Sequence, residues 1–277
     1  MHKVTIGSVE ITALLDAPFW LSPQYFVPEH ADEMIRDWGH KMNERGLIQN
    51  AITCYLVRSA GKNVLVDTGA GPRKRAGLPL GTLPDALSEA GITPADIDVV
   101  IHTHLHTDHV GWNTVDTDDG KREIFFPNAR FIIQQAEWDY WMTPERLAAP
   151  NGAHLRECVE PLTNTGRITF MQSEEAFDEN LVFIPSPGHT PGHVAVGIAS
   201  GGERGIIIGD ASHHAVQLEH PDWSPALDSD PLQSAKSRDQ MIELAIREDR
   251  LWAAGHWEHP GLGRIVRVDG KRIFRAL

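Results

Sequence analysis

The sequence has little cysteine, no long apolar run and no excess of positive charge, and each shortage excludes a class of protein. Its two cysteines, Cys54 and Cys158, lie far apart without CxxC spacing, so they form no disulfide framework and fit a reducing compartment. No stretch approaches the roughly 18 consecutive apolar residues needed to span a bilayer. The formal net charge of −13 disfavours nucleic acid and anionic membranes as main partners.

The length of 277 residues and the ordinary composition predict a globular chain, which we expect to form one domain over residues 1–277. Residues 1–7 lack the apolar centre and cleavage site of a secretory signal, so we expect a cytoplasmic protein. Segment 18–50 mixes aromatic with charged residues in an irregular pattern. We expect it to act as a lid or a dimer contact, which is compatible with a homodimer.

Short runs rich in Val and Ile predict strands, and between them lie patterns with helical spacing. Two stretches show neither pattern, 18–50 and 213–230. The predicted helices are 83–90, 136–141 and 231–250. The predicted strands are 4–15, 51–58, 63–67, 99–102, 130–134, 181–185, 194–198 and 205–208.

Histidine is abundant, with 15 in the chain, and the densest group directly follows the apolar run 98–101. Here His104, His106, Asp108 and His109 form an H-x-H-x-D-H pattern. In extended backbone His104 and His106 point the same way, so both can bind one metal ion. Where the chain turns, Asp108 and His109 can reach a second ion. Neutral imidazole and carboxylate suit zinc, manganese, iron and similar ions.

Four neighbouring ligands cannot complete two metal sites, so we expect others from later in the chain. His189 stands in a turn rich in Gly and Pro, and Asp210 and His256 each follow an apolar run that ends on Gly. Each signal alone is weak, but together they predict the missing ligands. His102 and His193 are expected to pack or to support neighbouring ligands instead.

In this order, the motifs resemble those of the metallo-β-lactamase superfamily of metallohydrolases, from about Thr53 to the C-terminus. The resemblance implies an α/β fold, a four-layer αββα sandwich of two mixed sheets with helices outside and a dinuclear metal site at one edge. The motifs that carry it are Val66-Asp67-Thr68-Gly69, His104-x-His106-x-Asp108-His109, Gly188-His189-Thr190-Pro191-Gly192-His193, Gly209-Asp210 and His256.

The resemblance also implies roles for the ligands. One ion is held by His104, His106 and His189, and the other by Asp108, His109 and His256. Asp210 bridges the two ions, and Asp67 orients ligands without binding metal. We expect two divalent ions, first of all Zn²⁺, with Mn, Fe and Co also compatible. A hydroxide bridging them would attack an ester-like bond while Asp108 and Asp210 orient it and transfer a proton.

The C-terminal part resembles the branch that contains N-acyl-homoserine lactonases and methyl-parathion-hydrolase-like enzymes, mainly in segments 213–231 and 256–264. Lactonases of this branch commonly carry Tyr three residues after the bridging Asp, where this chain has His213. A neutral imidazole can donate the same hydrogen bond, so His213 is a candidate catalytic residue. Candidate aromatic residues for the pocket are Trp20, Tyr25, Phe26, Trp38 and Trp112.

We therefore expect a metal-dependent hydrolase of a small ester-like substrate, a lactone first of all. Two alternatives remain open at this point. One is a phosphotriester or aryl-ester hydrolase that uses the same site. The other is an oxidoreductase of the sulfur-dioxygenase type with a single iron. A non-catalytic binding protein is disfavoured because the ligand set is intact.

Overall fold

The computed structural model describes residues 1–172 and 174–277, and its strands form two large sheets and a small ribbon. The first sheet has seven strands in the order β1-β2-β3-β4-β5-β8-β9. Their bounds are β1 His2–Ile6, β2 Val9–Leu21, β3 Ile48–Ser59, β4 Lys62–Val66, β5 Val99–Ile101, β8 Arg130–Gln134 and β9 Ile168–Met171.

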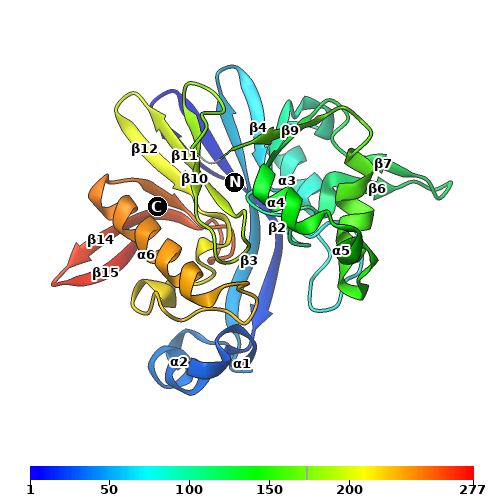
Figure 1. Cartoon of the computed structure of the whole chain (residues 1–277). Coiled ribbons are helices and arrows are strands. Elements are labelled where there is room, and N and C mark those ends of the chain that lie inside the picture. Colours follow the sequence, from blue (N-terminus) through cyan, green and yellow to red (C-terminus); the bar gives the residue numbers. More distant parts are fainter. Residues whose placement is uncertain (173) are drawn as a thin grey trace.

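The second sheet has six strands in the order β10-β11-β12-β13-β14-β15, and β6 pairs with β7 apart from both (Figure 1). The bounds are β6 Thr114–Asp116, β7 Arg122–Ile124, β10 Leu181–Pro185, β11 Val194–Ser200, β12 Glu203–Ile207, β13 Leu251–Ala253, β14 Leu262–Val268 and β15 Lys271–Ala276. Both large sheets are mixed, because β4, β5, β8 and β9 pair in parallel in one and β12 pairs in parallel with β13 in the other.

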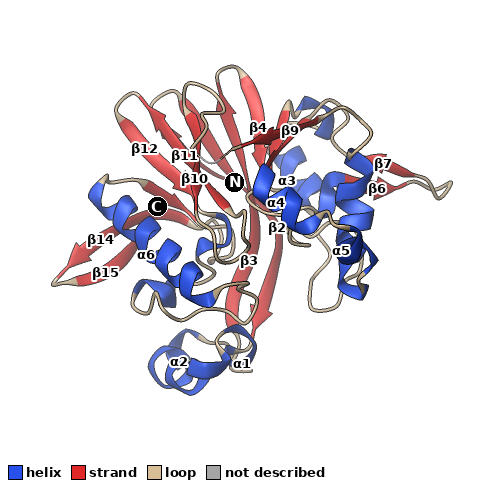
Figure 2. Cartoon of the chain, in the orientation of Figure 1, coloured by secondary structure: helices blue, strands red, loops and turns tan. Residues whose placement is uncertain are grey.

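The two sheets pack face to face and helices cover their outer faces (Figure 2). Between the sheets lies a core to which both contribute, including Val57 and Ile101 from one and Phe183 and Val196 from the other. The helices are α1 Pro23–Phe26, α2 Ala31–Trp38, α3 Leu83–Glu89, α4 Gln135–Trp141, α5 Pro144–Ala148 and α6 Pro231–Arg247. The predicted αββα sandwich of two mixed sheets is confirmed.

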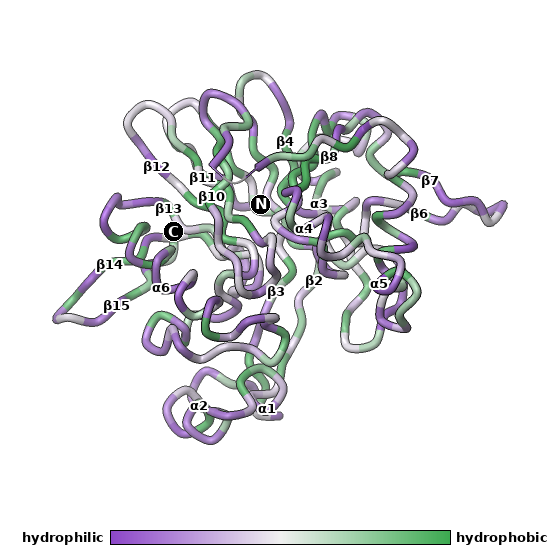
Figure 3. Tube along the Cα trace, in the orientation of Figure 1, coloured by the Kyte–Doolittle hydropathy of each residue, from purple (hydrophilic) through white to green (hydrophobic). Residues whose placement is uncertain are grey.

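Strands buried along most of their length, such as β3 and β11, give each large sheet two apolar faces, and the tube coloured by hydropathy shows the apolar strands at the centre (Figure 3). Leu83 and Leu87 of α3 pack on the outer face of the first sheet, against residues that include Leu65. Met241 and Ile242 of α6 do the same on the second sheet. Among the described residues, no helix has both the length and the apolar character that a bilayer crossing requires.

The structure corrects several predicted elements. The single strand predicted at 4–15 is two strands, because Gly7 has a positive φ of 55° and makes the turn between them. Segment 18–50 is not irregular, since β2 continues to Leu21, α1 and α2 follow, and β3 begins at Ile48. The helix predicted to end at residue 250 ends at Arg247. The predicted strands do not include β6, β7, β9, β13, β14 or β15.

The connections that carry the predicted ligands emerge at one edge of the sandwich. β5 runs parallel to β4 and β8, and β12 runs parallel to β13, so the segments after β5, β12 and β13 leave from carboxyl ends of parallel strands. Such ends are where α/β proteins place their sites. The turn between β10 and β11, residues 186–193, joins them.

Candidate metal centre

The seven predicted ligands come together in two groups. The first consists of His104, His106, His189 and Asp210, and the second of Asp108, His109 and His256. Within each group, the atoms that could bind metal all lie within 4.8 Å of one another. The side chains of the cluster are buried or nearly so, although Asp108 keeps 15% of its side chain exposed.

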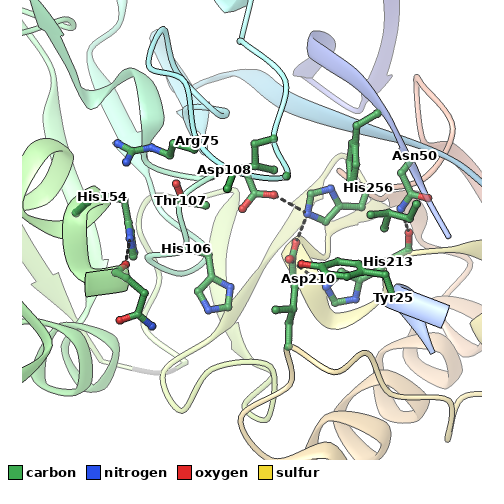
Figure 4. A pocket seen from close by; sticks show the side chains of 18 of the residues that line it. Tyr25, Asn50, Arg75, His106, Thr107, Asp108, His154, Asp210, His213 and His256 are labelled. Atoms are coloured by element: carbon green, nitrogen blue, oxygen red, sulfur yellow. Dashed lines mark hydrogen bonds and ion pairs between the residues drawn. The ribbon is translucent and has the colours of Figure 1, made fainter. Parts of the chain in front are cut away.

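Asp210 lies between the two groups. Its Oδ2 is 3.2 Å from Nε2 of His189, in the first group. Its Oδ1 is 3.1 Å from Nε2 of His109 and 3.2 Å from Nε2 of His256, in the second. Figure 4 shows Asp210 and Asp108 reaching His256 from two sides. One carboxylate oxygen therefore faces each group, which is the placement that a bridging ligand needs.

The donor set fits two divalent cations. Three of its buried atoms, Nε2 of His104, Nε2 of His109 and Oδ1 of Asp210, have no hydrogen-bond partner among the described residues. Buried polar atoms are rarely left in this way unless another group satisfies them. In addition, Nε2 of His189 and Nδ1 of His106 lie 2.8 Å apart, so two ring nitrogens converge on one point. Imidazole and carboxylate groups converging in this manner suit zinc and similar ions.

Two rings of the first group are neutral and the central carboxylate is ionised. Burial lowers the pKa of His104 and His106 well below the usual value, which keeps both rings neutral and able to bind metal. Burial alone would raise the pKa of Asp210, but the surrounding histidines, His256 and His109 first, hold it well below its usual range. The central carboxylate is therefore ionised.

Four of the histidines are fixed through Nδ1, which leaves Nε2 directed at the centre. His109 Nδ1 lies 2.8 Å from Asp67, His189 Nδ1 lies 2.8 Å from Asp228, and His256 Nδ1 lies 2.8 Å from the carbonyl oxygen of Ala51. His104 Nδ1 lies 3.1 Å from the hydroxyl of Thr103. Such outer partners set the tautomer and direction of a ligand.

Asp67 is placed as a supporting group should be. It has a positive φ of 60° and accepts hydrogen bonds from the amide and hydroxyl of Thr103, both at 2.8 Å. Its contact with His109, together with His102 at 3.8 Å, lowers its pKa despite the burial that would raise it. His193 supports Asp210 in turn, because its Nε2 accepts the Asp210 amide hydrogen at 2.9 Å.

The metal-ligand cluster forms one wall of a cavity of about 620 Å³, which the chain surrounds with largely apolar side chains. His213 lines it, with Nε2 3.1 Å from Oδ2 of Asp210, and its ring stacks on His256 with centroids 5.6 Å apart (Figure 4). The apolar lining residues are Phe19, Leu21, Tyr25, Ala76, Leu78, Trp141, Pro150, Ala153 and Leu227.

Of the five aromatic residues suggested for the pocket, Tyr25 lines this cavity. Trp38 lines a different cavity, beside β15. Trp112 is buried and donates its Nε1 hydrogen to Asp16 at 2.9 Å. Phe26 belongs to the cluster under α1 and α2, and Trp20 is 44% exposed on β2.

Sequence reasoning missed Asp228, Glu137 and Trp141. Asp228 lies in segment 213–231, which carries the resemblance to the lactonase branch, but no role was predicted for it. Asp230 caps α6, accepting from the Gln233 amide at 3.0 Å, while Asp228 turns inward to His189. Arg238, fully buried on α6, holds the other oxygen of Asp228 at 3.3 Å. No local signal in the sequence separates Asp228 from the exposed Asp230 two residues later.

Comparison with known proteins agrees with these motifs. A sequence model described as the metallo-beta-lactamase superfamily matches residues 48–115. An N-acyl homoserine lactonase from a Bacillus species is 25% identical over 228 residues, which are 76% of this chain and 82% of the relative.

Solved structures extend the likeness to the whole chain. The hydrolase AbOPH, of the beta lactamase superfamily, has a TM-score of 0.87 and 26% identity, and the alignment covers 100% of this chain and 97% of AbOPH. AidC, a dizinc quorum-quenching lactonase, has a TM-score of 0.82 and 24% identity with the same coverage. The motif order, the αββα sandwich and these matches show that the chain contains a metallo-beta-lactamase superfamily domain.

Proposed function

We propose that the chain is a metal-dependent hydrolase that opens a small lactone. The observation that carries this proposal is the pair of ligand groups that meet at Asp210 on the wall of a cavity. Two divalent ions, Zn²⁺ first of all, would be held by His104, His106 and His189 on one side and by Asp108, His109 and His256 on the other. The N-acyl homoserine lactonases among the similar proteins support a lactone as substrate.

The cavity fits a small molecule of mixed character. Its volume of about 620 Å³ lies within the range of ligand pockets, and apolar side chains line most of it. Thr107, Asp108 and His213 are the polar groups beside the metal-ligand cluster, and the lining has further polar residues at Asn50, Lys74, Arg75, Asn151 and His154. An ester or lactone bond would therefore lie over the cluster while an apolar chain extends along Phe19, Leu21 and Leu227.

When bound, two divalent ions supply a hydroxide nucleophile near neutral pH and polarise the carbonyl oxygen of the substrate. The chain's own residues position the reaction. Asp210 is held by the amide contact with His193 and is directed at the centre. Asp108 is partly exposed to the cavity, so its carboxylate can take a proton and return it to the leaving oxygen.

His213 is positioned to donate a hydrogen bond to the substrate carbonyl. Burial lowers the pKa of His213, so its ring is neutral and keeps one N–H for donation. Its Nε2 lies 3.1 Å from Oδ2 of Asp210, and its Nδ1 has no hydrogen-bond partner among the described residues. The ring lies on the cavity wall beside Asp210, where the carbonyl of a bound ester would be.

The first test combines elemental analysis of the purified protein with a hydrolysis panel of lactones, aryl esters, phosphotriesters and a cephalosporin. We expect about two metal ions per chain and turnover of a lactone. Turnover of phosphotriesters or aryl esters without lactones would instead assign the alternative hydrolase. One iron per chain, a silent panel and thiol-dependent oxygen uptake would overturn the hydrolase proposal.

A pair of variants ties any activity to the site. Asp210→Ala removes the group that faces both ligand sets and should abolish turnover and reduce bound metal. Asp139→Asn changes an exposed carboxylate on α4 and should leave both unchanged. Equal activity in the two variants would place the reaction elsewhere.

A further inference from the structure

We propose that Glu137 is a positioning residue that locks two ligand-bearing segments, 104–106 and 186–193, into one geometry. The inference rests on the proposed metal centre but concerns a residue outside it. Glu137 lies on α4 and is 1% exposed. It belongs to neither ligand group, and it does not line the cavity.

Each oxygen of the Glu137 carboxylate accepts two hydrogen bonds. Oε1 accepts from the amide of Leu105 at 3.0 Å and from Nε1 of Trp141 at 2.7 Å. Oε2 accepts from the hydroxyl of Thr190 at 2.7 Å and from the amide of Gly192 at 3.0 Å. Leu105 stands between His104 and His106, and Thr190 directly follows His189. One buried carboxylate thus joins the backbone segments of all three histidines in the first ligand group.

The loop 186–193 fits against α4 only because position 192 is glycine. A Cβ added to Gly192 would lie 2.1 Å from the backbone nitrogen of Glu137, closer than real atoms approach. The loop backbone is therefore pressed directly on the first turn of α4. This contact fixes how far His189 extends from the helix.

Trp141 extends the same arrangement to His106. Its ring lies edge-on to the His106 ring, with centroids 5.3 Å apart, while its Nε1 hydrogen is held by Glu137. Because Trp141 also lines the cavity, the carboxylate sets one wall of the cavity together with the direction of His106. The second ligand group has no such contact with Glu137: His109 is held by Asp67 and His256 by the Ala51 carbonyl.

The structure therefore predicts that loss of Glu137 weakens metal binding at the first group and leaves the second unaffected. The variant Glu137→Gln tests metal binding at the two groups separately. Its amide nitrogen cannot face the amide of Leu105 and Nε1 of Trp141, because both are obligate donors. The introduced amide nitrogen can instead face Thr190, because the Thr190 hydroxyl can accept a hydrogen bond. The backbone amide of Gly192 then loses its acceptor. The variant thus releases the loop of His189.

The experiment measures Zn²⁺ affinity by chelator competition in two backgrounds. His256→Ala impairs the second group, and His189→Ala impairs the first. We expect Glu137→Gln to lower the affinity about 10- to 100-fold in the His256→Ala background, as loss of an outer-shell partner does, and to leave it unchanged in the His189→Ala background. Asp139→Asn, an exposed acid on the same helix, serves as the matched control and should change neither.

An equal fall in both backgrounds would reduce Glu137 to a general structural residue, and no fall in either would overturn the proposal. Neither result depends on any substrate, so the test stands even if no hydrolysis is found. If Glu137→Gln does not fold, Thr190→Val decides instead, because it removes one donor and keeps the volume. It should produce a smaller fall confined to the His256→Ala background, and an unchanged affinity there would refute the proposal.

Discussion

His213 stands at the cavity wall beside Asp210 with a neutral ring whose Nδ1 has no hydrogen-bond partner among the described residues. Replacement by alanine should lower kcat by about 10²-fold, the usual effect of losing one donor to a developing oxyanion, and raise KM less. Steady-state kinetics on the best substrate of the panel measures the changes in kcat and in KM separately. His214→Asn, at the next residue, is the control and should keep kcat. An unchanged kcat in His213→Ala would assign the ring to packing.

Asp108 and His256 belong to the same ligand group, with Oδ2 of Asp108 3.4 Å from Nε2 of His256. Asp108→Ala and His256→Ala should each lower the metal content toward one ion per chain and largely abolish hydrolysis. The reason is that each removes one of only three donors in the second group while the first stays complete. Elemental analysis and turnover of the same preparations provide the check. Full activity in either variant would refute the dinuclear proposal.

His214 makes stability depend on pH. Burial lowers its pKa to about 4, with the charge of Lys41 adding to the effect, and Nδ1 accepts the Val216 amide hydrogen at 3.2 Å. As pH falls from 6.5 toward 4, the unfolded chain takes up a proton that the folded chain refuses. The free energy of unfolding therefore falls over this window, by at most ~3 kcal/mol.

The variant His214→Asn retains an acceptor for the Val216 amide and removes the titration. Denaturant titrations at pH 7 and pH 4.5 should show that the wild-type protein loses more stability than the variant, by roughly 2 kcal/mol. Because the other histidines are common to both proteins, their contributions cancel in the comparison. Parallel losses in the two proteins would contradict this role of His214.

Among the elements, the turn 186–193 is confined on both sides by glycine contacts. A Cβ on Gly192 would meet α4, and a Cβ on Gly188 would lie 2.1 Å from the backbone of Ser234 on α6. Gly192→Ala should therefore destabilise the fold by about 1–3 kcal/mol, the usual effect of overpacking, and weaken metal binding. Gly39→Ala is the control, because Gly39 has a helical φ of −54° and a Cβ added there would meet no atom within 4 Å. Equal unfolding midpoints for the two variants would contradict the argument.

The same elements show why part of the molecule could be predicted from sequence. The buried strands β5, β8 and β10 are short continuous apolar runs, and the three histidine motifs directly follow strands or lie between them. Continuous apolar character marks a strand buried on both faces, and the residues after it must lie at the sheet edge. Local pattern therefore indicated the strands and the candidate ligands that follow them, whereas the αββα sandwich was implied by the resemblance of the motifs to the metallo-β-lactamase superfamily.

Strands and contacts that depend on distant partners could not be predicted in this way. β15 carries three basic residues and is exposed or half-buried throughout, so its pairing with β14 decides its structure. Glu137 and Asp228 each receive hydrogen bonds or ion pairs from segments far away in sequence. No local signal distinguishes them from the exposed carboxylates nearby, such as Asp139 and Asp230.

At the scale of the molecule, the candidate metal centre joins the two sheets. His104, His106, Asp108 and His109 follow β5 of the first sheet, whereas His189, Asp210 and His256 follow strands of the second. Each ligand group takes members from both sets. Bound ions would therefore connect the two halves of the sandwich, in addition to the apolar core between them.

This arrangement predicts that metal stabilises the whole fold in one cooperative transition. Zn²⁺ added to the metal-free protein at 100 times its Kd should add about 2.7 kcal/mol per site to the free energy of unfolding, and raise Tm by roughly 5 °C per site. Scanning calorimetry with increasing Zn²⁺ measures the shift, and Asp210→Ala, which lacks the shared ligand, should lose most of it. Ions that join the two sheets stabilise both of them. We therefore expect one thermal unfolding transition, whose midpoint rises as Zn²⁺ is added. Two transitions, with only one responding to Zn²⁺, would show that the ions are held within one half and would refute the shared centre.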